Sequence, residues 1–190
     1  MTGTEIALVI LVGVALGLLW VWRRASRLDR LHRKLAATRM TLESELTRRA
    51  TAAARLASSG VLDPVSSVLV GEAAFTALAV PRWDEPGIDR AQAESELSLT
   101  LRAALDDVDE VAELRSSELG ARQLEELSTA WYRSQLARRF HNEAAAQTQR
   151  QRRKAVVRAL HLAGHAAWPA TVDLDDGWPE ALGRPGASPG

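Results

Sequence analysis

Few residues in this sequence have the types and spacing needed for chemistry, and the best pair lies near residue 160. His161 and His165 stand four residues apart, so a helix would place both imidazoles on one face, a spacing that can bind zinc. The glutamate that should follow the first histidine is replaced by Leu162, and no third ligand is evident nearby. We therefore rank a metal-dependent enzyme using this pair below the non-enzymatic functions, and we expect no catalytic residue, no cofactor and no metal.

Composition excludes several other kinds of chemistry. The chain has no cysteine, which removes disulfides, thiolate nucleophiles and cysteine-ligated metal centres. It also has no glycine-rich phosphate loop, nucleophile elbow or dinucleotide-binding fingerprint. Lys plus Arg equals Asp plus Glu at 24 each, and the zero net charge argues against a nucleic-acid partner.

An uninterrupted apolar run near the N-terminus predicts a membrane helix. Residues 6–22 contain no polar side chain other than the indoles of Trp20 and Trp22, which suit the membrane interface. A cleaved signal peptide is the alternative, but residues 1–5 carry no basic residue and the run ends in Trp and Arg. We therefore expect a retained transmembrane helix preceded by a short extracytoplasmic segment.

Basic residues flank only the C-terminal side of this run. Six of them lie between positions 23 and 34, namely Arg23, Arg24, Arg27, Arg30, Arg33 and Lys34. Since basic flanks stay on the cytoplasmic side, we expect a single-pass protein of the cell membrane with its N-terminus outside and the rest of the chain cytoplasmic. Arg23, Arg24 and Arg27 would then face the anionic headgroups of the lipid bilayer.

The remaining chain is patterned as helices separated by Gly and Pro. Apolar residues recur at helical spacing over 23–58, 64–79, 90–113 and from Gly120 to about residue 165. Asp63 and Pro64 form a start signal. The second helix is so apolar that it is either largely buried or faces a partner, and we favour burial. The breaks at Gly60 and Pro81 favour a folded-back chain. The fold class expected is all-α, with the transmembrane helix followed by an antiparallel four-helix bundle over 23–166 whose first and last helices are long.

The C-terminal parts of the chain offer two binding hypotheses. In such a bundle the basic run Arg150, Arg152 and Arg153 would return to the membrane surface, although an ordinary solvated helix face explains it equally well. Residues 167–190 are rich in Gly and Pro and predict a disordered tail. Trp168 and Trp178, set among acidic residues, would make this tail a short partner-binding motif if it does more than terminate the chain.

Three stretches resemble the LemA family. Residues 127–144, LSTAWYRSQLARRFHNEA, resemble the family motif L-T-x-T-E-N-R-I-A-x-A-R-R-x-Y-N-x-A, and residues 93–101 and 46–49 resemble its A-E-N-x-L-S-x-x-L and L-K-R-R stretches. The positions of the first motif that carry the likeness are Leu127, Arg133, Ala137, Arg138, Arg139, Phe140 and Asn142. The resemblance implies one membrane helix with an outside N-terminus and a cytoplasmic antiparallel bundle, and it implies no particular activity.

The matched arginines have a structural and a functional interpretation. Arg138, Arg139 and Asn142 lie within about one helical turn, so they would pair with acids of the third helix such as Glu94 or Glu96, or else receive an anionic ligand. We favour the structural pairing.

Taken together, these features favour a non-enzymatic membrane-anchored scaffold or adaptor for another membrane or cytoplasmic protein, whose identity the sequence does not give. The alternative is a self-assembling membrane structural or stalk protein, for which a homo-oligomer would be the functional state.

Overall fold

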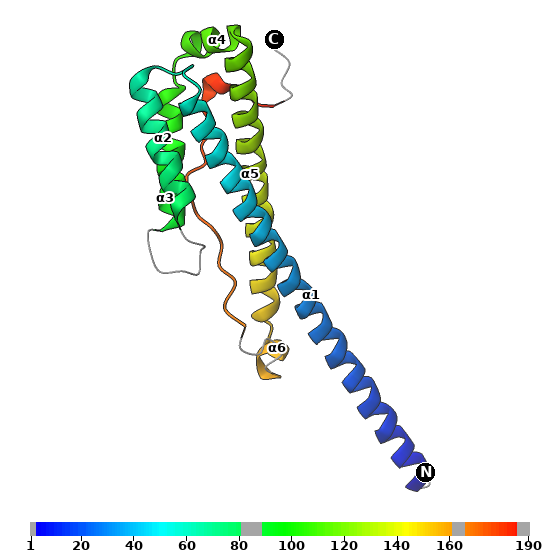
Figure 1. Cartoon of the computed structure of the whole chain (residues 1–190). Coiled ribbons are helices and arrows are strands. Elements are labelled where there is room, and N and C mark those ends of the chain that lie inside the picture. The colour runs from blue at the N-terminus through cyan, green and yellow to red at the C-terminus, as the bar shows by residue number, and fades with distance from the viewer. Residues whose placement is uncertain (1–2, 81–88, 161–165, 186–190) are drawn as a thin grey trace. The chain divides into compact units, whose positions relative to one another are not determined.

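The computed structural model describes residues 3–80, 89–160 and 166–185, and within these ranges the chain is all-helical with no strand (Figure 1). The elements in chain order are α1 (Gly3–Ser58), α2 (Pro64–Ala79), α3 (Arg90–Ala104), α4 (Val108–Ser116), α5 (Glu118–Arg152), α6 (Ala155–Ala159) and the 3-10 helix η1 (Glu180–Leu182). The prediction of an all-α protein is confirmed.

The chain divides into two compact units, and α1 and α5 each contribute to both. Unit 1 comprises Met1–Thr38 and Asn142–Thr171, and unit 2 comprises Arg39–His141 and Val172–Gly190. Unit 1 therefore holds the apolar N-terminal stretch and the basic residues that follow it. Unit 2 holds α2, α3 and α4 with the adjoining parts of α1 and α5.

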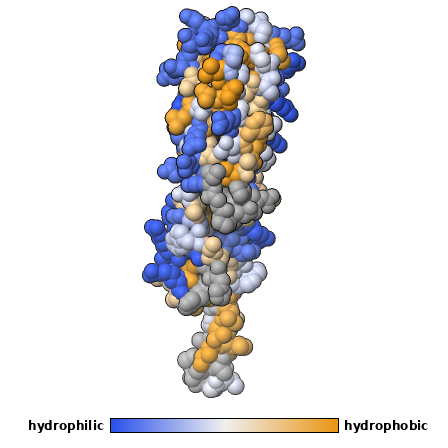
Figure 2. Space-filling view, turned by 60° about the vertical axis from the view of Figure 1, so that its left-hand side comes forward, coloured by the Kyte–Doolittle hydropathy of each residue, from blue (hydrophilic) through white to orange (hydrophobic). Residues whose placement is uncertain are grey.

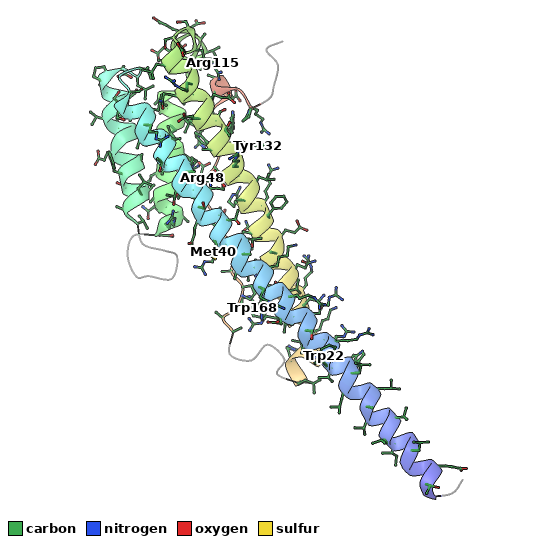
Figure 3. The ribbon with its side chains drawn as sticks, turned by 45° about the vertical axis from the view of Figure 1, so that its right-hand side comes forward. Trp22, Met40, Arg48, Arg115, Tyr132 and Trp168 are labelled. Atoms are coloured by element: carbon green, nitrogen blue, oxygen red, sulfur yellow. The ribbon has the colours of Figure 1, made fainter. Side chains whose placement is uncertain are left out.

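The N-terminal apolar run belongs to a single long helix. α1 is continuous from Gly3 to Ser58, and its apolar part is long and hydrophobic enough to cross a membrane, a test that a signal sequence would also pass. That part has no buried residue. Trp22 projects from α1 with 65% of its surface exposed (Figure 3), and the Arg24 guanidinium lies 5.1 Å from the Trp20 ring centroid.

Unit 2 is built around an apolar core in which α1 contributes mostly alanine. Ala50, Ala53 and Leu56 of α1 meet Leu97 of α3 and Trp131 of α5 in one buried cluster. Small side chains on α1 let the neighbouring helices approach closely. α2 then begins where Asp63 caps it, since the Asp63 carboxylate accepts hydrogen bonds from the backbone N–H groups of Val65 and Ser66 at 2.9 and 3.1 Å.

The predicted third helix over 90–113 is wrong in one respect, because it is broken into α3 and α4. Leu105 leaves the helical conformation with its side chain buried. The Asp107 carboxylate accepts hydrogen bonds from the backbone N–H groups of Asp109 and Glu110, at 2.8 and 3.2 Å, and so starts a new helix. The run of acids over residues 106–110 therefore contains a helix N-cap, Asp107.

The last long helix begins earlier and ends earlier than predicted. α5 starts at Glu118, before Gly120, and ends at Arg152. Gly120 does not break the helix. A Cβ at this position would collide with the carbonyl oxygen of Leu114, so glycine allows α4 and α5 to meet closely. The expected continuation to residue 165 is replaced by the short α6, and residues 161–165 lie outside the described part.

The prediction of a disordered tail is wrong for residues 172–182. Leu174 and Leu182 are buried, and η1 packs against α4. The Arg115 guanidinium also donates to the carbonyl of Leu182. Ordering this segment costs conformational entropy. The buried leucines and the charge-assisted hydrogen bonds offset that cost, so the segment is ordered despite its Gly and Pro content.

Candidate functional site

Arginines and tryptophans that lie far apart in the sequence meet at one place in unit 2, where residues 172–182 lie against α5 and α3. We call this stretch the C-terminal segment. Trp131 of α5 is fully buried, and its ring centroid lies 5.8 Å from that of Trp178 at an interplanar angle of 49°. The Arg49 guanidinium lies 5.3 Å from the Trp131 centroid. The predicted tail residue Trp178 is therefore engaged by the chain itself.

Arg138 binds the C-terminal segment rather than an acid of α3. Its Nε and Nη2 donate to the two carboxylate oxygens of Asp176, both at 2.8 Å. The backbone carbonyl of Asp176 accepts from Gln135 Nε2 at 2.6 Å and from Trp131 Nε1 at 3.2 Å. Three residues of one α5 face thus hold a single residue of the C-terminal segment.

A second bidentate pair holds the preceding residue. Arg102 of α3 donates to both oxygens of Asp175, at 2.8 and 2.6 Å, and the Asp175 N–H donates to Ser95 Oγ at 2.9 Å. The Arg102 hydrogen bonds are the largest cause that lowers the pKa of Asp175 to about 2, and the N–H of Gly177 adds to the effect. The segment is therefore anchored by two neighbouring carboxylates, each held by an arginine from a different helix.

The acid of α3 that was expected to pair with Arg138 or Arg139 pairs with Arg49. Arg49 Nη2 lies 2.8 Å from Glu94 Oε2, both side chains are fully buried, and Nη1 donates to Ser98 Oγ at 2.9 Å. The predicted pairing is wrong in its partner, because α1 rather than α5 carries the buried arginine. The sequence did contain a signal: Arg49 lies on the same helical face as Leu42, Leu46 and Leu56.

The other positions of the family-like motif divide between core and surface. Leu127 and Ala137 are buried, as an apolar stripe predicts. Arg133, Arg139 and Phe140 are exposed, with 53% of Phe140 accessible. Asn142 is half-buried and belongs to unit 1. The motif therefore contributes packing residues and one arginine, Arg138, that holds the C-terminal segment. Its residues do not come together in a ligand pocket.

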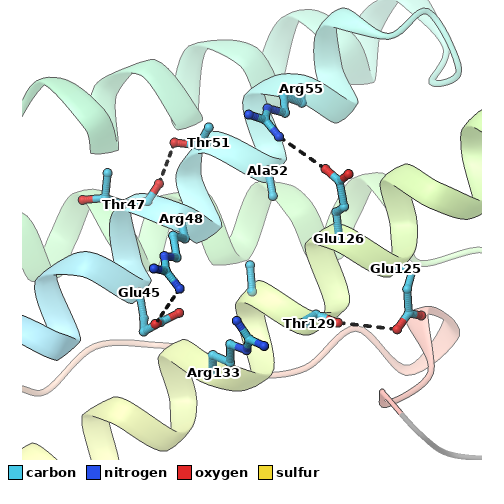
Figure 4. Close-up of a pocket in the computed structure, with 11 residues that line it drawn as sticks. Glu45, Thr47, Arg48, Thr51, Ala52, Arg55, Glu125, Glu126, Thr129 and Arg133 are labelled. Carbon is cyan, nitrogen blue, oxygen red and sulfur yellow. Dashed lines mark hydrogen bonds and ion pairs between the residues drawn. The ribbon is translucent and has the colours of Figure 1, made fainter.

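Arg133 lines a groove of about 450 Å³ between α1 and α5 (Figure 4). Its charged side chains are mixed: Arg55 lies 3.6 Å from Glu126, and Arg48 lies 3.2 Å from Glu45. Acids and bases that neutralise one another give the groove no preference for a cation or an anion.

The second basic run contacts its own chain in unit 1. Arg152 donates to the carbonyls of Ala167 and Ala166 at 2.5 and 2.9 Å, and its guanidinium lies 5.1 Å from the centroid of Trp168. Arg153 lies 6.0 Å from the same centroid, and Arg150 is exposed. On α1, Arg23 and Arg27 are exposed and Arg24 is half-buried. Trp168, labelled in Figure 3, keeps 52% of its surface accessible.

The candidate metal ligands of this chain are its histidines and acids. Within 3–80, 89–160 and 166–185 there is no group of three or more histidine and acidic side chains that would hold a metal. The predicted pair His161 and His165 lies outside these ranges. His32 of unit 1 is half-buried, and burial followed by the nearby Arg152 charge lowers its pKa. The nearby carboxylate of Asp29 opposes this shift but does not outweigh it.

An exposed apolar face lies on α2, the helix for which burial was favoured over contact with a partner. We define the α2 face as the five exposed large apolar residues Val65, Val68, Leu69, Phe75 and Leu78. Val65 and Val68 are 67% exposed and Phe75 is 66% exposed. Figure 2 shows hydrophobic side chains gathered on this side of the molecule. The expected burial of α2 is correct only for its opposite face, where Val70, Ala74 and Ala77 enter the core.

The chain matches no protein-family model, no curated protein and no solved structure.

Proposed function

We propose that this protein is a non-enzymatic scaffold or adaptor, anchored in the membrane by α1, that recruits another protein through the α2 face. The observation that carries the proposal is the exposure of large apolar side chains on a helix whose other face is packed in the core. Contiguous exposed apolar surface on a folded domain marks a site of interaction with a protein or membrane. The arginines that hold residues 172–182 support a structural role, since Arg102 and Arg138 each donate to a carboxylate of the same chain.

We propose a divergent LemA-like architecture, as the sequence resemblance implies. In this proposal the unit 2 part of α1, α2, α3 and the unit 2 part of α5 form an antiparallel four-helix bundle, with α4 as a corner between the last two. The apolar cluster that draws residues from all four helices supports it. The five-residue link 59–63 between α1 and α2, with Gly60 at φ 75°, also suits a reversal of chain direction.

We place the protein in the cell membrane with its N-terminus outside, the apolar stretch of α1 across the bilayer and the chain from Arg23 onward cytoplasmic. The basic residues after the apolar stretch support this orientation, and Arg23, Arg24 and Arg27 are the ones nearest the bilayer. Arg150, Arg152 and Arg153 belong to the same unit and would add a second basic contact with anionic lipid. Arg152 has part of its donor capacity already used by the chain, so we expect Arg150 and Arg153 to contribute more.

The test is affinity purification of the full-length protein after crosslinking in its native membrane. The test variant is Val68→Ser with Phe75→Ser, which makes the α2 face polar without touching the core. The matched control is Met40→Ser with Tyr132→Ser, exposed apolar residues of α1 and α5 that are 71% and 44% accessible (Figure 3). We expect recovery of a partner protein to fall at least fivefold with the test variant and to stay unchanged with the control.

Equal recovery from both variants would contradict recruitment through α2. Recovery of only this protein and lipid would contradict an adaptor function and favour the self-assembling structural protein. Surface substitutions of this kind change the free energy of unfolding by about 0.5 kcal/mol or less, so matched melting curves identify any variant lost through misfolding.

A further inference from the structure

The apolar α2 face continues into a groove between α2 and α3. The groove has a volume of about 360 Å³, and its apolar sides include Leu69 of α2 and Leu99 of α3, which are 52% and 53% exposed. Two charged residues line it, Glu72 of α2 and Glu96 of α3, and both are acidic. Glu96 accepts a hydrogen bond from Gln92 at 3.0 Å. Because the Gln92 amide is neutral, the negative charge of Glu96 stays uncompensated.

Glu72 also lies at the centre of the exposed stripe that the α2 face forms along the helix. The stripe runs from Val65 to Leu78, and Glu72 occurs near its middle with no basic residue anywhere in α2. Any helix that covers the stripe must therefore lie beside this carboxylate. A carboxylate at an apolar contact is costly unless an opposite charge meets it.

This position of Glu72 argues against a second copy of the chain as the occupant. A two-fold interface joins the same surface of both copies, so an antiparallel pairing of α2 with α2 brings the centres of the two stripes together. The two Glu72 carboxylates would then face each other without a cation. The same charge opposes an anionic membrane surface, which would otherwise accept an apolar helix face.

We propose that the α2–α3 groove binds a basic amphipathic helix of another protein. Such a helix would insert its apolar stripe between Leu69 and Leu99 and pair Lys or Arg with Glu72 and Glu96, which is a helix-in-groove interaction. The stripe from Val65 to Leu78 is about 20 Å long at 1.5 Å per residue, so the partner helix has roughly four turns. This inference rests on the proposed recruitment through α2 and adds the chemistry of the partner.

The experiment uses the full-length chain in nanodiscs of zwitterionic lipid, with empty nanodiscs as the blank. The probes are two fluorescent 16-residue helical peptides with the same leucine stripe, one flanked by lysine and the other by glutamate. Fluorescence anisotropy should show the lysine peptide binding at least tenfold more tightly than the glutamate peptide. Phe75→Ser should weaken the lysine peptide at least tenfold.

The charge-reversal variant Glu72→Lys with Glu96→Lys should invert the preference between the two peptides. Its matched control reverses two exposed acids elsewhere, Glu113→Lys with Glu143→Lys, and should keep the preference. Equal binding of both peptides, or a preference that both reversals change alike, would overturn the inference. Light scattering that shows a dimer which Phe75→Ser dissociates would also overturn the inference, because the occupant of the groove would then be a second copy of the chain.

The two proposals fail separately. If crosslinked partner recovery depends on Val68 and Phe75 but neither peptide is preferred, recruitment through α2 stands and the basic helix is wrong. If the lysine peptide is selected but no partner is recovered from the membrane, the groove chemistry stands and the adaptor function is wrong.

Discussion

At the scale of single residues, charge decides how unit 2 is held together. Arg49 and Glu94 form a fully buried pair, and Arg49 also donates to Ser98 and lies over Trp131. Two unpaired charges at these positions would each be far more costly than the pair, so the arginine and the acid specify how α1 packs on α3. The pair fixes the register of α1 against α3.

We expect Arg49→Met to lower the free energy of unfolding by about 3 kcal/mol, because it leaves the Glu94 carboxylate buried without its main partner. The double variant Arg49→Met with Glu94→Leu should be less destabilised than Arg49→Met alone, since the stranded charge is removed. Denaturant unfolding of the full-length protein in detergent measures both. A double variant as unstable as the sum of the two single variants would show that the residues act independently.

A pH dependence belongs to Asp175. Its pKa is lowered from 3.8 to about 2 in the folded protein, chiefly by Arg102. Because the folded pKa is the lower one, the stabilisation by this carboxylate is fully present above pH 3.8 and is lost as the pH falls toward 2. The difference in melting temperature between the native chain and Asp175→Asn should therefore be constant near neutral pH and shrink over this acidic range. A difference that does not change with pH would contradict the Arg102–Asp175 pairing.

At the scale of elements, the sequence predicted helices well and their ends and partners less well. The long helices and the start of α2 at Asp63 and Pro64 follow from periodicity and capping chemistry that are local in the sequence. The docking of the C-terminal segment depends on contacts between residues 38 to 75 positions apart, such as Arg138 with Asp176 and Arg102 with Gly177. Local patterns carry no information about such contacts, which is why Gly and Pro content alone suggested disorder.

The two faces of α2 show the same limit. A helix that is apolar all round predicts burial from composition, yet only the side with Val70, Ala74 and Ala77 has neighbours within the chain. Which side packs is decided by α3 and by the alanine-rich part of α1. The candidate site therefore could not be located from the sequence, although the unusual apolarity of α2 was visible in it.

Gly120 and Gly71 provide a prediction about helix packing. Gly120→Ala should lower the free energy of unfolding by about 2 kcal/mol, because the new methyl group collides with the Leu114 carbonyl at the α4–α5 corner. Gly71→Ala is the matched control, since its Cβ would meet only the Ala57 methyl at 3.7 Å. It should be neutral or raise stability by up to about 1 kcal/mol through the better helix propensity of alanine. If both variants were equally stable, the close approach at Gly120 would be refuted.

At the scale of the whole molecule, we propose a chain anchored by α1 on the inner side of a membrane. The chain has no cysteine, so single cysteines report topology cleanly. Thr4→Cys should react with a membrane-impermeant maleimide in intact cells, whereas Ser116→Cys in α4 should react only after permeabilisation. The reverse pattern would place unit 2 outside. If the mature protein lacks the N-terminal residues that carry Thr4→Cys, the apolar stretch is a cleaved signal sequence.

The most direct test of recruitment through α2 is photocrosslinking from within the face itself. A photoreactive amino acid replaces Val68 in the full-length protein in its native membrane, and the same amino acid replaces Met40 of α1 as the control. We predict one discrete adduct of another protein from position 68 and none of that mass from position 40. No protein adduct from position 68, or the same adduct from both positions, would contradict the claim that α2 is the recruiting surface.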